Sequence, residues 1–250
     1  MGSEEISRLQ EFLRATAARG RVVVVVTPFT AYFTGDDPLK YLNYAIPDGD
    51  VEPKPEEVER LRDVFQSRQR LPRLEWIEEA APRVVAALAA AGMEEELRTP
   101  LMSCSPEELV EPAGDVPDLA VSTVGPEELR EAADIQKVAF GGRPLEPDEE
   151  PKAPSGGGVL ARSGVTAASA AAWTPVVDGF SEIVGVATAD EWRGRGLAGV
   201  VTAAAARAAF AAGAGVCILS PGNETAQRVY ARAGFRRVAT MLHWSDPSGA

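Results

Sequence analysis

The sequence predicts an α+β (α/β) protein in which a mixed central sheet is flanked by helices. Short β-branched and apolar runs alternate with longer helical patterns along the 250 residues. In the second half the predicted order is strand, helix, three strands, helix, strand, helix, strand. Such an alternation places the strands side by side and packs the helices on the sheet. A stretch rich in Pro, Gly and acidic residues at 111–117 separates the two halves.

The first half has a regular pattern but no motif that indicates chemistry. The five valines at 22–26 predict a strand, and a run that is apolar on both faces is expected to be central and buried. Turn residues punctuate Gly35–Pro38. The remaining patterns predict a helix from Ser3 to Gly20, helices from Pro55 and Pro82, and strands at 41–46 and 97–104.

The second half is more regular. It predicts strands at 119–124, 158–162, 165–173, 180–188, 216–220 and 236–244, and helices at 126–140, 197–212 and 223–233. Residues 141–158 are rich in Gly, Pro and acidic side chains, and we expect a mobile loop that is too polar to pack.

Composition excludes several classes of function. The net charge of −12 argues against nonspecific nucleic-acid binding, and no apolar stretch is long enough to span a bilayer. The acidic start is unlike a signal peptide, so we expect a cytoplasmic protein. We also expect a monomer or a homodimer. Two distant cysteines and a single histidine, His243, give no metal-binding spacing, and no metal is expected.

The most informative stretch is Val184–Ala198. An apolar strand stops at Asp190-Glu191, and a turn with two arginines and two glycines opens a long Ala-rich helix. Backbone N–H groups converge at such a helix start, and the helix dipole adds partial positive charge. Gly194 and Gly196 let the backbone approach a bulky phosphate. The stretch therefore predicts an anion-binding site.

Two phosphate-binding patterns fit this stretch less well. The pattern G-x-x-x-x-G-K-[ST] is absent, whereas G-x-G-x-x-G is present as Gly194, Gly196 and Gly199. A dinucleotide site also needs an acidic residue that closes the next strand, roughly 20 residues on. The next strand, Val216–Ser220, ends without one.

A third pattern, R-x-x-G-x-A, is filled by Arg193, Gly196 and Ala198. A second motif follows one strand later, N-x-x-A-x-x-x-Y-x-x-x-G-F, and its fixed positions are Asn223, Ala226, Tyr230, Gly234 and Phe235. Asn223 is placed to cap the helix that begins there. The two motifs, in this order and with a strand between them, resemble those of the GNAT superfamily of N-acetyltransferases.

The resemblance implies that the bound anion is the pyrophosphate of an acyl-CoA, with acetyl-CoA expected as co-substrate. It implies cofactor contacts at Val186, Ala187, Thr188, Arg193, Gly194, Arg195, Gly196, Leu197, Ala198, Asn223 and Ala226. Tyr230 would protonate the leaving thiolate, and Glu182, on the strand before the turn, is the best candidate for general base. Asp190 and Glu191 are rival bases, but a turn beside phosphate suits a base poorly.

The resemblance also implies two lobes. Residues 1–112 would form a degenerate GNAT-like N-terminal lobe, and residues 117–250 the GNAT catalytic domain that binds acyl-CoA. The family has a seventh strand that this chain lacks. We hypothesise that a strand of the first half, with Val22–Val26 as the candidate, fills that slot.

The predicted function is transfer of an acyl group, expected to be acetyl, from acyl-CoA to an amine of a small molecule or peptide. The amine would attack directly in a ternary complex. The alternative is a non-catalytic acyl-CoA-binding sensor or scaffold, which needs the anion site but neither Tyr230 nor Glu182. No residue pattern identifies the acceptor.

Overall fold

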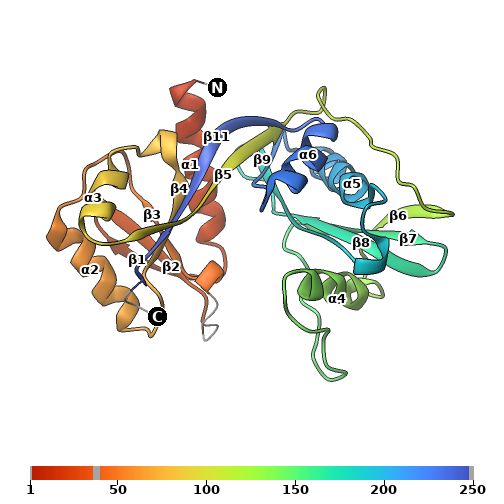
Figure 1. Cartoon of the computed structure of the whole chain (residues 1–250), viewed down its shortest axis with the longest axis horizontal. Coiled ribbons are helices and arrows are strands. Elements are labelled where there is room, and N and C mark those ends of the chain that lie inside the picture. Colours follow the sequence, from red (N-terminus) through yellow and green to blue (C-terminus); the bar gives the residue numbers. More distant parts are fainter. Residues whose placement is uncertain (1, 36–39, 248–250) are drawn as a thin grey trace. The chain divides into compact units, whose positions relative to one another are not determined.

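The computed structural model describes residues 2–35 and 40–247 (Figure 1). The expected turn at Gly35–Pro38 falls largely outside them. The helices are α1 (Ser3–Ala17), α2 (Pro55–Gln66), α3 (Val84–Ala90), α4 (Leu129–Ala139), α5 (Leu197–Ala211) and α6 (Glu224–Arg232). The strands are β1 (Val22–Val26), β2 (Phe29–Phe33), β3 (Tyr44–Pro47), β4 (Arg73–Ile77), β5 (Glu94–Cys104), β6 (Leu119–Thr123), β7 (Gly157–Ser163), β8 (Thr166–Trp173), β9 (Phe180–Thr188), β10 (Val216–Leu219) and β11 (Arg236–Ser245). The predicted α+β class is confirmed.

The chain forms two compact units. One comprises residues 1–101 and 238–250, and the other comprises residues 102–237. The predicted lobe boundary at 112–117 falls inside the second unit, between β5 and β6, and the division into lobes stays a prediction. None of the helices in the described part of the chain is long and apolar enough to cross a membrane.

The two halves of the sequence repeat one order of elements. β1, β2, β3, α2, β4, α3 and β5 correspond to β7, β8, β9, α5, β10, α6 and β11. In each series the third and fourth strands pair in parallel, β3 with β4 and β9 with β10. This order is what a degenerate copy of one fold predicts.

The last strand of each series completes the sheet of the other unit. In the second unit, residues 102–104 of β5 pair antiparallel with β10, and Cys104 lies opposite Cys217. In the first unit, residues 241–245 of β11 pair antiparallel with β4. A strand of the first half therefore does take the place beside β10, but it is β5 and not Val22–Val26.

The predicted burial of Val22–Val26 is wrong. β1 pairs with β2, a strand that the sequence patterns did not predict, and the exposed fractions of Val22 and Val25 are 55% and 70%. β-branched residues favour extended backbone whether or not both faces are covered. The composition of the run therefore determined its conformation but not its position in the sheet.

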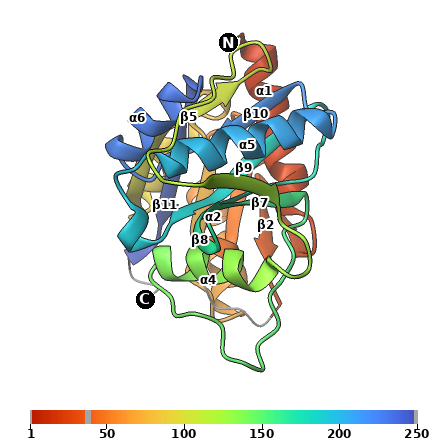
Figure 2. The same ribbon diagram turned by 90° about the vertical axis from the view of Figure 1, so that its right-hand side faces the viewer.

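In the second unit, α5 and α4 cover opposite faces of the sheet (Figure 2), and α6 packs against α5. α5 packs on β7, β8 and β9, and α4 packs on β8 and β9 from the other side. The core under α5 is built from small residues that let helix and sheet approach closely, including Ala205, Ala206 and Ala209. Aromatic side chains such as Phe65 and Trp76 are more frequent in the core of the first unit, although the second core also contains Trp173 and Phe235.

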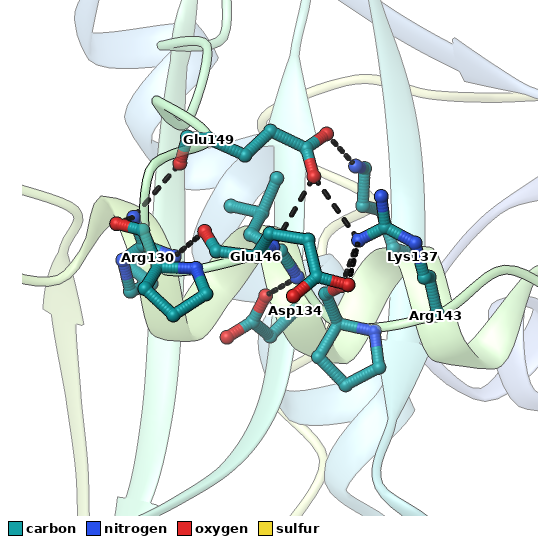
Figure 3. Close-up of polar contacts among 9 residues, drawn as sticks. Arg130, Asp134, Lys137, Arg143, Glu146 and Glu149 are labelled. Carbon is teal, nitrogen blue, oxygen red and sulfur yellow. Dashed lines mark hydrogen bonds and ion pairs between the residues drawn. The ribbon is translucent and has the colours of Figure 1, made fainter.

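The segment after α4 is held by polar contacts rather than left unpacked (Figure 3). Arg130 donates to the backbone oxygens of Glu146, Pro147 and Glu149, and Lys137 forms an ion pair with the Glu149 carboxylate at 2.5 Å. The hydrogen bond from Lys137 is the main reason that the pKa of Glu149 falls to about 2. The first part of 141–158 is thus mostly exposed and is held by ion pairs and backbone acceptors, and the expectation that this loop is mobile stays a prediction.

Candidate functional site

The strand–turn–helix unit predicted from the sequence is present. β9 ends at Thr188, a short 3-10 turn spans Asp190–Trp192, and α5 begins at Leu197. Its N-cap residue is Gly196, which makes no side-chain cap, and the first turn holds no acidic residue. Since the first N–H groups of a helix have no partner within the helix, they remain available to an external anion.

The three glycines of this turn have different roles. Gly194 and Gly196 have φ values of 77° and 80°, a region that favours glycine. A methyl group at Gly196 would also lie 2.8 Å from the carbonyl oxygen of Ala113. Gly199 faces Pro112, with 3.1 Å between an added Cβ and the ring. The third glycine of G-x-G-x-x-G therefore serves close packing of the helix.

The charged side chains of the turn are partly engaged with neighbours. Arg193 forms an ion pair with Asp190 at 2.7 Å, and both side chains are largely exposed. The guanidinium of Arg195 lies 5.2 Å from the centre of the Trp192 ring. The indole N–H of Trp192 is buried and has no hydrogen-bond partner. Because this nitrogen is shielded from the cavity as well as from solvent, Trp192 lines the cavity without presenting its N–H there.

β9 carries a bulge just before this turn. In the ladder with β8, Ala170 lies opposite Ala187 but Ala172 lies opposite Val184, so β9 has one extra residue between them. Gly185, in this interval, has a φ of 62°. Its carbonyl oxygen accepts a hydrogen bond of 2.8 Å from the side chain of Gln136 in α4.

β9 also extends beyond its parallel partner. The registered pairs with β10 end at Glu182 and Ile218, and β10 itself ends at Leu219. β9 continues to Thr188, and the strand pairings in the described part of the chain join this extension to β8 alone. The opposite edge of residues 183–188 can therefore offer backbone groups to an extended ligand.

α6 forms the other wall of the site. The side chain of Asn223 accepts a 2.9 Å hydrogen bond from the N–H of Ala226, so it caps the helix as expected. Tyr230 lies one turn further along and is partly buried. Burial raises the pKa of its phenol to about 12, so the hydroxyl stays protonated at neutral pH.

These elements enclose one cavity of about 480 Å³. Nearly all of the predicted site residues line it, namely Val186, Ala187, Thr188, Arg193, Gly194, Gly196, Leu197, Ala198, Asn223, Ala226 and Tyr230. Arg195 and Glu182 are the predicted residues that do not. The cavity thus brings together two motifs that lie some thirty residues apart in the sequence.

Glu182 lies on β9 but away from this cavity. Its backbone N–H donates to the hydroxyl of Thr174 at 2.9 Å, and its carbonyl accepts from the N–H of Thr174. The bulge places Val184 and Ala187 on the same face of the sheet, and Glu182, two residues before Val184, lies on that face too. Glu182 thus shares a sheet face with the cavity residue Ala187 but does not itself line the cavity. Its role as a base stays a prediction.

Sequence reasoning missed several cavity residues. Ala139 and Phe140 come from the end of α4, and Trp192, Thr225, Val229 and Arg232 also line the wall. Spacing along α6 could have identified Val229, which shares a helix face with Ala226. Phe140 had no local signal, because only the packing of α4 on the sheet brings it to the cavity.

Comparison with known proteins agrees with this geometry. Residues 159–244 match the family described as FR47-like protein. The structure resembles a GCN5-related N-acetyltransferase from Kribbella flavida, with 30% identity over 97% of this chain and 95% of that chain, and a TM-score of 0.83. The protein belongs to the GCN5-related N-acetyltransferase (GNAT) family.

Two more distant structures share the fold over most of this GNAT chain. A GNAT-family protein from Novosphingobium aromaticivorans is 19% identical, covers 98% of both chains and has a TM-score of 0.59. A tandem GNAT protein from the clavulanic acid biosynthesis pathway is 12% identical over 87% of this chain and 77% of that chain, also with a TM-score of 0.59. No curated protein matches the sequence.

Proposed function

We propose that this GNAT protein transfers an acyl group, expected to be acetyl, from acyl-CoA to an amine of a small molecule or peptide. The observation that carries the proposal is that the open N-terminus of α5 and the Tyr230 side chain line the same cavity. Acyl-CoA is one extended ligand that could reach both places, with its diphosphate at the N-terminus of α5 and its thioester near Tyr230.

The start of α5 fits a diphosphate. Its N–H groups have no side-chain cap, its first turn has no carboxylate, and Gly194 and Gly196 remove side-chain bulk. Arg193, which lines the cavity, adds a guanidinium. Acyl-CoA would supply the activated thioester, while these residues hold and orient it.

The β9 extension fits the arm of the ligand that carries amide groups. Residues 186–188 line the cavity beyond the end of β10, so their backbone groups can bond to an extended ligand as a neighbouring strand would. Backbone N–H groups here are also candidates to stabilise negative charge on the thioester oxygen. Asn223 faces the same cavity from α6, and its capping hydrogen bond holds its side chain in place.

Tyr230 is the proposed proton donor to the leaving thiolate. Its pKa of about 12 keeps the phenol neutral, so it acts as a hydrogen-bond donor and acid and not as a base. The cysteines give no route through a covalent intermediate. Cys104 and Cys217 are buried, and burial raises the pKa of each thiol to about 12. Direct attack by the amine in a ternary complex is therefore the favoured course.

One observation favours the alternative of a non-catalytic acyl-CoA-binding sensor or scaffold. The cavity lining, over the part of the chain that the structure describes, contains no carboxylate and no imidazole. Transfer then requires that Glu182 or a water reach the amine from outside the cavity, or that the acceptor arrive as the neutral amine. A sensor requires neither.

A two-stage experiment separates these functions. Acetyl-CoA is first titrated into the full chain by calorimetry, and thiol release is then measured against a panel of small-molecule and peptide amines. Binding followed by amine-dependent release supports the transferase. Binding without release for any amine supports the sensor, and absence of binding contradicts both.

A further inference from the structure

The segment Glu108–Asp115, which we call the strap, overlaps the stretch 111–117 that separates the two halves of the sequence, and it lies against both motifs of the site. At one end it contacts the turn that opens α5, and at the other it contacts the C-terminal end of α6. All of these contacts lie inside the second unit. The strap does not line the cavity, so any effect on the ligand must act through these contacts.

At the turn, the strap fixes the direction of one peptide group. The N–H of Asp115 donates to the carbonyl oxygen of Arg195 at 2.8 Å. In a trans peptide the C=O and the following N–H point in opposite directions. The bond to Arg195 therefore directs the N–H of Gly196 away from the strap, and Gly196 lies at the wall of the cavity.

Close packing holds the strap in register with α5. Methyl groups added to Gly114 would come within 2.8 Å of Leu119 and 3.1 Å of Leu197, so strap and helix are in tight contact. The ring of Pro112 contacts Gly199, and Glu111 forms an ion pair with Arg207, about two turns further along α5. A side chain at Gly114 would therefore require these leucine side chains to move.

The other end of the strap is tied to the end of α6. The N–H of Val110 donates to the carbonyl oxygen of Ala233 at 3.1 Å, and Glu108 forms an ion pair with Arg236 at 3.2 Å. The backbone oxygen of Glu108 occupies the space where a Cβ at Gly234 would lie, and Gly234 has a φ of 98°. The strap thus spans from the turn to the helix that carries Tyr230.

We propose that the strap is a positioning element of the acyl-CoA site, and that the backbone N–H of Asp115 orients the Gly196 N–H toward the diphosphate. This inference rests on the proposed function. A positioning role for the strap accounts for glycine at two positions of the motifs, Gly196 and Gly234, because a Cβ at either position would collide with a backbone oxygen of the strap. The strap fixes both the direction of the donor and the spacing between the two ends of the ligand.

The test compares Asp115→Pro with Asp115→Ala in the full chain. Proline removes the N–H, whereas alanine keeps it and removes only an exposed side chain. Loss of one hydrogen bond of typical net strength predicts a Kd for acetyl-CoA about tenfold higher in Asp115→Pro. Asp115→Ala should bind as the unaltered chain does. Coenzyme A without the acetyl group should lose the same factor, because the effect lies at the diphosphate end.

A second pair keeps the inference testable if Asp115→Pro does not fold. Gly199→Ala places a methyl group against Pro112 and should raise the Kd several-fold, while thermal stability holds because alanine favours the helix. Adding Pro112→Ala should restore the affinity by removing the opposing ring carbon. Gly215→Ala is the matched control, since its Cβ would meet only an ordinary contact at 3.7 Å.

The outcomes distinguish the two proposals. If the unaltered chain does not bind acetyl-CoA in calorimetry, the proposed function fails. If the unaltered chain binds but Asp115→Pro and Gly199→Ala bind equally well, the strap has no positioning role. A loss in Gly199→Ala that Pro112→Ala does not reverse, or a loss shared by Gly215→Ala, also overturns it. The positioning role is supported if Asp115→Pro loses affinity while Asp115→Ala does not, and if adding Pro112→Ala restores the affinity that Gly199→Ala loses.

Discussion

The helices α2 and α5 follow corresponding strands of the two halves, yet their N-termini differ in what they can bind. At α2, the carboxylate of Glu57 accepts the N–H of Lys54 at 2.8 Å, and Glu56 and Glu57 both lie in the first turn. At α5, Gly196 caps the helix without a side chain, and the first turn holds no acid. The first N-terminus therefore carries two carboxylates, one of which bonds the N–H of its N-cap residue, whereas the second carries none.

The helices that follow the next strands differ in the same way. α6 carries Tyr230, whereas α3 is built only from Val, Ala and Leu across Val84–Ala90. The same order of elements thus lines the candidate acyl-CoA cavity in one half, whereas the corresponding helix of the other half carries only aliphatic side chains. The comparison teaches that the fold supplies a place for an anion, but the residues of the first turn decide whether the place is available.

Gly196→Val should have the largest effect on the open N-terminus. Valine disfavours a φ of 80°, and its Cβ would meet the Ala113 oxygen, so the turn must move and displace the diphosphate. We expect acetyl-CoA affinity to fall by about 100-fold or more. Gly164→Val is the matched control, because Gly164 also has a positive φ but no atoms near its Cβ position. Equal binding by both variants would break the comparison.

Tyr230→Phe should separate binding from transfer. Removing the hydroxyl should leave the acetyl-CoA Kd unchanged and lower amine-dependent thiol release by roughly 10²-fold, the typical contribution of a general acid. Burial raises the pKa of Tyr230 to about 12, so the acid form persists as pH rises through the range where an ordinary tyrosine ionises.

In the unaltered chain, ionisation of Tyr230 should therefore cause no fall in the rate of thiol release up to about pH 10, the pKa of a free tyrosine. The pH profile of release at saturating acetyl-CoA measures this. An alkaline decline near pH 10 which disappears in Tyr230→Phe would contradict the raised pKa of Tyr230. A Tyr230→Phe variant that releases thiol as fast as the unaltered chain would contradict the assigned role as acid.

Much of this site could be predicted from sequence because its signals are local. The run from Val184 to Ala198 and the motif from Asn223 to Phe235 each fold as a contiguous strand–turn–helix or helix. That Gly196 and Tyr230 line one cavity was implied by the resemblance of the two motifs to the GNAT superfamily, and the structure places both residues at that cavity. The bounds of β9 and the cap at Asn223 followed from the same local rules.

The remaining features depend on pairing between distant segments. The placement of β5 beside β10 and of β11 beside β4 has no local signature, because any apolar strand satisfies the same edge. Composition could not show that Val22–Val26 lies at an edge, or that the polar segment after α4 is held by Arg130. Phe140 reached the cavity for the same reason, through the packing of its helix.

Ala198→Glu would convert α5 toward the pattern of α2. Ala198 lies in the first turn and lines the cavity, so a carboxylate there would bond the same N–H groups and repel a diphosphate. We expect acetyl-CoA affinity to fall about tenfold, with thermal stability unchanged or raised. Ala198→Gln has a similar size without the charge and should bind more tightly than Ala198→Glu. Equal affinities would show that charge at this turn does not matter.

Glu57→Gln should have the smallest effect and should not reach the ligand. It weakens the hydrogen bond to the Lys54 N–H and removes a carboxylate from the first turn of α2, which should lower the free energy of unfolding by about 1 kcal/mol. Urea unfolding measures this loss, and acetyl-CoA titration should give an unchanged Kd. A large change in affinity would mean that the two N-termini are not independent.

The most direct measurement is a crystal structure of the full chain with acetyl-CoA. It should place the diphosphate against the backbone N–H groups of 194–198 and the thioester sulfur beside the hydroxyl of Tyr230, inside the cavity that both already line. Acetyl-CoA bound elsewhere, or in this cavity with Tyr230 separated from the sulfur by other side chains, would contradict the assignment of the site.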